Sequence, residues 1–181
     1  RYVRNSVKVT VDAVTGEILF YRVPVGDPMA DAFAQAYPEI FLGIEEMPQD
    51  LREHLRYPRS LLDLQSDVLL QYHQETAEEF HGQQDVWVQA QELSNSPNPV
   101  PYVPEYGIYT LPDEEVAQFQ LTNVFVPAGR ENLTAMLVAR TDTKGTPEMI
   151  LMDVPVDDEV LGPRLIEARL EQDPVISQQF S

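Results

Sequence analysis

The chain opens with alternating hydrophobic and polar residues. Residues 2–12 place valines on one parity and mostly polar side chains on the other. This period of two is typical of a β-strand that buries one face. A turn at residues 14–17 and a second β-rich run at residues 17–23 come next. The pattern therefore predicts a β-hairpin over residues 1–23.

The hydrophobic period becomes helical after Asp27. Asp27 followed by Pro28 marks a helix start, because aspartate caps helices and proline is tolerated at the first helical position. Pro38 should end this helix near Tyr37. We expect its apolar stripe to face the core, and that stripe comprises Met29, Phe33, Ala36, Tyr37 and Ile40.

Two further helices complete a predicted helical layer over residues 27–81. One occupies residues 48–57 between two prolines and buries Leu51 and Leu55. The other begins with a capping-box pattern at residues 60–63. Its apolar stripe consists of Leu61, Leu64, Val68 and Tyr72.

The second half of the chain has the composition of β-strands. A polar, proline-rich stretch over residues 94–104 predicts an extended loop. Strands are expected at residues 86–91, 106–111, 119–126 and 149–154. The run 133–141 is ambiguous, because its Ala, Met and Leu suit a helix while its length and position suit a strand; we interpret it as a strand.

Pro163 opens a short terminal helix that Pro174 closes, and we expect its apolar residues Leu165, Ile166 and Leu170 to face inward. Strands, then helices, then strands again predict an α+β fold. The sheet should be mainly antiparallel, with a layer of three to four helices on one face. We expect a single domain over residues 1–181, in which residues 102–154 supply strands and 163–181 form a C-terminal helical segment.

Composition and charge restrict the classes of function. Twelve Lys and Arg against 30 Asp and Glu give a formal charge of −18, which disfavours nucleic acid as a partner. The acidity suits either cations or a basic partner, or simply a solvated surface. The chain has no cysteine and no apolar run of about 18 residues. It begins within an apparent strand, so we expect a fragment of a longer protein.

One group of side chains has the chemistry of a metal site. His73, Glu78 and His81 lie in a short run that also contains Glu75 and Glu79. In a continuous helix the two histidines would be separated by ~12 Å, too far for one zinc ion unless the chain folds back. The alternative is a polar helix end in solvent.

Arg52 and Arg56 are the candidate anion-binding pair. At positions i and i+4 of a helix they would share a face and could clamp a phosphate or carboxylate. The alternative is internal pairing with nearby carboxylates, namely Glu45, Glu46, Asp50 or Asp63.

An acidic loop is a weaker candidate for Ca²⁺, because it lacks the spacing and glycine of an EF-hand; its residues are Asp153, Asp157, Asp158 and Glu159. Solvated turn residues are the alternative. The chain has neither a G-x-S-x-G elbow nor a glycine-rich phosphate loop. The sequence therefore identifies no catalytic residue and implies no cofactor.

Three blocks carry a resemblance to a known family: RNSVKVTVDAVTGEILFY, EMPQDLREHLRYPRSLLDLQSDVLLQYH and GPRLIEARLEQDPVISQQFS. In this order they resemble the uncharacterised protein family 0182, large bacterial membrane proteins found mainly in actinobacteria and cyanobacteria. The resemblance implies several N-terminal membrane-spanning helices and a long region outside the cytoplasm, of which this chain would be an internal portion. It carries over no catalytic or ligand residues.

Two hypotheses about function follow. The first is a non-catalytic extracytoplasmic interaction or assembly module of a multi-pass membrane protein. Its partners would be the membrane-spanning part of the same protein and other envelope proteins. The second is an envelope enzyme or a domain that binds a ligand through a divalent metal.

Overall fold

The first sheet is built on the predicted hairpin. The computed structural model describes residues 3–93, 98–142, 145–155 and 157–180, except the side chains of residues 179 and 180. β1 (Val7–Val11) and β2 (Ile18–Arg22) pair antiparallel, which confirms the hairpin. The carboxylate of Asp12 accepts hydrogen bonds from two backbone N–H groups of the turn.

β3 (Phe41–Gly43) was not predicted; it pairs parallel with β2 and completes a three-stranded sheet. Three residues are too few to show a period. This sheet has its own small core of buried side chains, comprising Tyr21, Val23, Ile44 and Met47.

The three predicted N-terminal helices occur in the predicted order, but the second is shorter than residues 48–57 and leaves Leu51 exposed. The helical elements of this region are α1 (Pro28–Ala36), the 3₁₀ turn η1 (Ile44–Glu46), α2 (Gln49–Arg52), α3 (Arg59–Tyr72) and α4 (Ala77–Gly82). Asp27 caps α1, as predicted, and accepts a hydrogen bond from the N–H of Met29. The capping box predicted at Ser60 is wrong, because α3 begins at Arg59 and its N-cap is Pro58, two residues before Ser60.

The main sheet has five antiparallel strands. They are β4 (Trp87–Gln89), β7 (Glu105–Tyr109), β8 (Gln118–Pro127), β9 (Ala135–Thr141) and β10 (Pro147–Asp153). Their order is β10-β9-β8-β4, and β7 pairs with β8 on the side opposite β9. The ambiguous run is thus confirmed as a strand. β5 (Gln91–Glu92) pairs antiparallel with β6 (Val100–Pro101), and β6 lies within the predicted loop.

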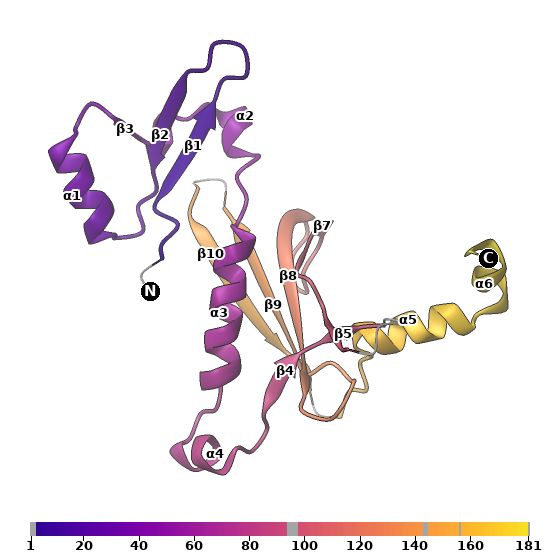
Figure 1. The fold of residues 1–181 in the computed structure, drawn as a ribbon. Coiled ribbons are helices and arrows are strands. Elements are labelled where there is room, and N and C mark those ends of the chain that lie inside the picture. Colours follow the sequence, from indigo (N-terminus) through magenta and orange to yellow (C-terminus); the bar gives the residue numbers. More distant parts are fainter. Residues whose placement is uncertain (1–2, 94–97, 143–144, 156, 181) are drawn as a thin grey trace.

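Helix α3 packs on one face of this sheet (Figure 1) and forms the main core with it. The contributing buried side chains are Tyr57, Leu61, Leu62, Leu121, Phe125, Ala135, Leu137 and Ala139. Odd-numbered residues of β8 and β9 therefore point at α3. Even-numbered residues such as Val124 and Val126 form a second cluster on the other face.

The two sheets meet at the β9–β10 turn. Gly145 has φ +82, and a Cβ atom there would lie 2.7 Å from Cγ1 of Ile44 in the small core. A side chain at position 145 would therefore strain the backbone and clash. The Nζ of Lys8 also donates a hydrogen bond to the carbonyl of Arg56, at 3.1 Å.

The α+β fold with mainly antiparallel sheets is confirmed, but the helices of residues 27–81 lie against two different sheets. α3 covers the main sheet, whereas α1 lies beside the three-stranded sheet (Figure 1). α1 turns its small residues Ala30 and Ala34 toward the protein and leaves its large apolar residues exposed. Arg22 of β2 holds this orientation through an ion pair with Asp31.

The C-terminal helical segment comprises α5 (Pro163–Gln172) and α6 (Pro174–Phe180), with Ser181 outside the described residues. Both helices extend away from the sheet (Figure 1). The predicted inward stripe is wrong for Ile166 and Leu170, which are exposed, while Leu165 is half-buried. Among the described residues, no helix combines the length and the apolar character needed to cross a membrane.

Candidate functional site

His73, the first residue of the predicted metal set, is held by the protein backbone. It follows α3, and its Nε2 lies 2.8 Å from the carbonyl oxygen of Asp85 and its Nδ1 lies 3.2 Å from that of Leu69. Both ring nitrogens thus lie within hydrogen-bond distance of a backbone carbonyl, and the tautomer decides which of them donates its N–H. The ring also stacks on Trp87, with centroids 4.1 Å apart.

Glu78 and His81, the other two residues of the set, lie on the exposed surface of α4. The capping box of this helix uses Thr76 and Glu79 instead. Within the described ranges, the structure brings together no group of three or more His, Asp or Glu side chains that could hold a metal ion. The three predicted ligands are therefore not assembled into a site.

Arg52 and Arg56 do not share a helical face, because α2 ends at Arg52. The predicted alternative, pairing with nearby carboxylates, is likewise not found in the part of the chain that the structure describes. Among the described residues, neither arginine has a carboxylate within ion-pair distance. Anion binding by this pair stays a prediction.

Arg56 instead belongs to an arginine–aromatic cluster with Arg59, Tyr106 and Phe119. The two rings stack with centroids 5.3 Å apart. The Arg56 guanidinium carbon lies 5.0 Å from the Phe119 centroid, and that of Arg59 lies 5.7 Å from the Tyr106 centroid. Such cation–π contacts stabilise the guanidinium of Arg56, which has no ion-pair partner among the described residues. The cluster attaches the start of α3 to β7.

The acidic loop that was the Ca²⁺ candidate borders an open cavity of about 910 Å³. Asp158 and Glu159 line it, together with Asp85 and Glu131 from other segments. Asp157 is exposed and is not part of the lining. The cavity holds no assembled group of metal ligands among the described residues, so its acidic lining alone indicates no ligand.

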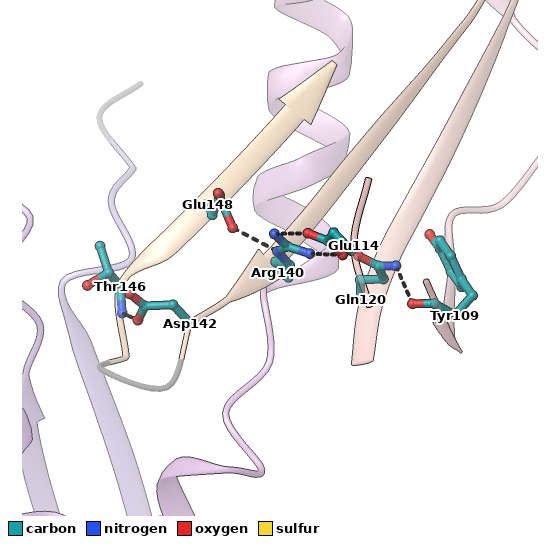
Figure 2. A network of polar contacts seen from close by, with 7 residues as sticks. All are labelled: Tyr109, Glu114, Gln120, Arg140, Asp142, Thr146 and Glu148. Atoms are coloured by element: carbon teal, nitrogen blue, oxygen red, sulfur yellow. Dashed lines mark hydrogen bonds and ion pairs between the residues drawn. The ribbon is translucent and has the colours of Figure 1, made fainter. Parts of the chain in front are cut away.

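Arg140 on β9 is the centre of a polar network that holds a loop against the sheet (Figure 2). Its guanidinium pairs with both oxygens of Glu114, at 2.7 and 3.0 Å, and its Nε donates to Glu148 on β10 at 2.7 Å. Hydrogen bonding to Glu114 raises the pKa of Arg140 and lowers that of Glu114. Because Glu114 lies between β7 and β8, the network fixes that connection on the sheet.

We expect the free energy of unfolding of Glu114→Gln to fall less on acidification than that of the wild type. The pKa of Glu114 is lowered below its ordinary value of 4.5, chiefly by the hydrogen bond from Arg140. A carboxyl with a lowered folded-state pKa contributes stability that is fully present above its unfolded pKa and is lost as the pH falls through the folded pKa. Urea unfolding at pH 7 and about pH 3 measures the free energy of unfolding of the wild type and of Glu114→Gln. The difference between the two proteins should be largest at pH 7 and smaller at the acid pH.

Glu115→Gln is the matched control, because Glu115 is exposed and has no partner among the described residues. This variant should keep the wild-type pH profile. A wild-type profile in Glu114→Gln as well would show that the Arg140 network contributes nothing to acid sensitivity.

A second polar network is buried beneath α3. Nδ2 of Asn123 donates to the hydroxyl of Ser66 at 2.8 Å and to Oε1 of Gln89 at 3.0 Å. Gln89 donates back to Asn123 and also to the carbonyl of Tyr102, at 3.0 Å. This network links α3, β8 and β4, so it determines how the helix sits on the sheet.

Two helix faces present large apolar side chains to solvent. On α1 and just after it, Met29, Phe33, Tyr37 and Ile40 are 47–57% exposed. On α5 and α6, Ile166, Leu170 and Val175 are 45–68% exposed. The spacing is that of an amphipathic helix with a covered face, yet the described residues leave these faces open. Such faces mark contact surfaces.

Sequence reasoning missed both polar networks. Arg140 does carry a signal, because it is the single charge in the mainly apolar run LTAMLVART. A charge within a buried strand requires a partner. Asn123 carries a similar signal between Leu121 and Phe125, whereas the partners of both residues come from distant segments.

Comparison with known proteins places these features in a family. The model of an uncharacterised protein family, UPF0182, matches residues 1–181. UPF0182 proteins from Moorella thermoacetica and Synechocystis sp. are each 38% identical over 99% of this chain. The chain spans about one-fifth of their length, 20% and 18% respectively. No solved structure matches it. On the match over its whole length, the chain belongs to the UPF0182 family.

Proposed function

We propose that residues 1–181 form a non-catalytic assembly module of a multi-pass membrane protein, held outside the cytoplasm. The exposed apolar faces of α1 and α5 carry the proposal. Each face has the composition of a helix surface that packs in a core, and the largest side chains point away from the described residues. Its partners would be the membrane-spanning part of the same protein and other envelope proteins.

The length of the relatives supports a partner within the same polypeptide. The chain covers only 20% of the Moorella thermoacetica protein, so about four-fifths of such a protein is available to cover these faces. A contact within one chain also forms without the translational entropy cost of association.

The charge of the domain supports a position outside the cytoplasm. Cytoplasmic segments next to membrane-spanning helices carry an excess of Lys and Arg. This chain has only 12 Lys and Arg against 30 Asp and Glu, so it lacks that cytoplasmic signature. The alternative of an envelope enzyme or metal-dependent binder gains no support from the described residues, because the predicted ligands are not assembled.

Thiol labelling of the full-length protein in intact cells tests the proposal. The chain has no cysteine of its own, so single cysteines can be introduced once any others in the protein are replaced. In Phe33→Cys and Ile166→Cys, we expect a membrane-impermeant maleimide to react at least about tenfold more slowly than at an exposed thiol, because a covered thiol reacts only during local opening. Denaturation should restore rapid labelling at both positions.

Val14→Cys is the matched control, because Val14 lies in the β1–β2 turn and is 94% exposed. It should label rapidly in intact cells. Labelling only after lysis would refute the extracytoplasmic position. Equal rates at positions 14, 33 and 166 would refute the assembly role, because the helix faces would then be open to solvent in the whole protein.

A further inference from the structure

Strand β10 forms one edge of the main sheet, and its outer side is unpaired among the described residues. It pairs only with β9. Its sequence, PEMILMD, is apolar at four central positions, yet none of its seven residues is buried. By contrast, β9 beside it is buried at five of seven positions. Figure 1 shows no element alongside the outer side of β10. A long, apolar, open edge is a ready template for another strand.

The register identifies which backbone groups of β10 are free. The N–H of Asp142 donates to the carbonyl of Thr146, and that of Val154 donates to Thr134. Hydrogen-bonded pairs alternate along an antiparallel ladder, so even-numbered residues of β10 bond to β9. The N–H and C=O groups of Met149 and Leu151 therefore point outward, and they have no partner among the described residues.

The side chains on this edge favour an apolar neighbour. Met149 and Leu151 are 44% and 41% exposed and project on the face that α3 covers. On α3, Asp63 and Asp67 line a small cavity on the β4 side. Leu64 and Val68 each follow one of these aspartates, so the helical period turns them about 100° away from that cavity, and both are exposed. A strand paired with β10 would therefore place every second side chain on the face that α3 covers. These side chains would lie next to Met149 and Leu151.

We propose that a β-strand from another part of the same polypeptide, outside residues 1–181, pairs with β10 and extends the sheet. The outward N–H and C=O groups of Met149 and Leu151 would form backbone hydrogen bonds with this strand. The apolar side chains at alternate positions of the strand would face α3. Recognition of this kind draws affinity from the backbone and specificity from alternate side chains. The inference rests on the proposed assembly function, because it names one partner of that module.

Two observations favour a strand of the same polypeptide over a second copy. Relatives of this chain are about five times its length, so chain is available to supply the strand. Two copies would each bring a formal charge of −18. Pairing of β10 with its own copy would also place two sets of the acidic residues Glu148 and Asp153 along one short ladder, and like charges oppose such association.

Residue-resolved amide hydrogen exchange of the full-length protein tests the pairing. We expect the amides of Met149 and Leu151 to exchange at least about a hundredfold more slowly than unprotected amides, as those of Ile150 and Met152 do. The latter two are the internal control, because their bonds to β9 protect them in either case. Rapid exchange at Met149 and Leu151, with Ile150 and Met152 protected, would overturn the proposal.

A matched pair of variants separates strand pairing from simple coverage. Leu151→Pro removes an outward N–H without removing a bond to β9, and it should abolish the protection at Met149. Leu151→Val keeps both the N–H and the strand conformation, so it should retain that protection. Unchanged protection of Met149 in Leu151→Pro would show that β10 is merely covered, which contradicts the pairing.

A photo-crosslinker in place of Leu151 identifies the occupant. A crosslink to a peptide of the same molecule outside residues 1–181 is the expected result. A crosslink to a second copy or to another protein would overturn the assignment to the same polypeptide. This inference and the proposed function fail separately, since thiol labelling reports on α1 and α5 whereas amide exchange reports on β10.

Discussion

Phe125→Ala is expected to lower the free energy of unfolding by about 3 to 5 kcal/mol, the usual cost of truncating a fully buried phenylalanine. Phe125 is inaccessible to solvent and packs in the core between α3 and the sheet. Its loss leaves a cavity that the rigid β8–β9 ladder cannot close. Urea unfolding of the 181-residue chain can be followed by the fluorescence of Trp87, the only tryptophan, whose ring centroid lies 6.4 Å from that of Phe125.

Phe119→Ala is the control on the same strand. Phe119 is 38% exposed and contacts Tyr106 and Arg56 at the surface, so its truncation should cost about 1 kcal/mol or less. Equal losses for both substitutions would show that the α3–sheet core does not dominate stability. Because domains are stable by only about 5 to 15 kcal/mol, the Phe125 variant loses a large fraction of its stability.

Asn123→Ala is expected to cost about 2 to 3 kcal/mol, although it removes only one small polar side chain. The cost arises from the partners that remain. Ser66 is fully buried and loses its partner, and Gln89 loses a reciprocal amide contact. A buried polar group without a partner carries its full desolvation penalty. Thermal or urea unfolding of the same chain measures the difference.

The double variant with Ser66→Ala isolates the origin of this cost. Once Asn123 is absent, removing the Ser66 hydroxyl also removes a buried group without a partner. The stability losses of the two single variants should therefore sum to more than the loss measured for the double variant. A coupling energy of about 1 kcal/mol is expected for groups in direct contact. Strict additivity would contradict the hydrogen bond between the two side chains as the source of stability.

Local patterns predicted the elements of this fold well. The parity of the N-terminal valines fixed the hairpin, and prolines 28, 38, 58 and 163 marked where helices begin or end. The ambiguous strand β9 shows the limit of periodicity. It is covered on both faces, so it lacks the alternation that identifies a strand with one buried face.

The arrangement of the elements was harder to predict, because it depends on distant contacts. The stripe of α1 has the pattern of a buried face, yet Ala30 and Ala34 pack inward and Phe33 points out. A sequence pattern shows that a face is apolar but does not identify what covers it. This ambiguity is unavoidable in a chain that spans one-fifth of its relatives' length.

The geometry of the candidate sites also depends on distant contacts. His73 has the chemistry of a metal ligand, but carbonyls at Leu69 and Asp85 occupy its ring nitrogens. Arg52 and Arg56 have the spacing of a helical pair, but α2 ends between them. The polar residues that organise the structure, Arg140 and Asn123, were recognisable as isolated polar groups in apolar runs, while their partners lie up to 57 positions away.

The order of the elements along the chain determines when the main core can form during synthesis. Leu62 on α3 packs against residues of β8 and β9 as far along as Ala139. A ribosome adds about 5 to 20 residues each second. Synthesis of the residues between Leu62 and Ala139 therefore takes roughly 4 to 15 seconds. Strands β8, β9 and β10 follow one another as adjacent hairpins and can pair within microseconds once they emerge. During synthesis the main core therefore closes only after β9 has emerged, and until then the apolar face of α3 lacks its partner strands.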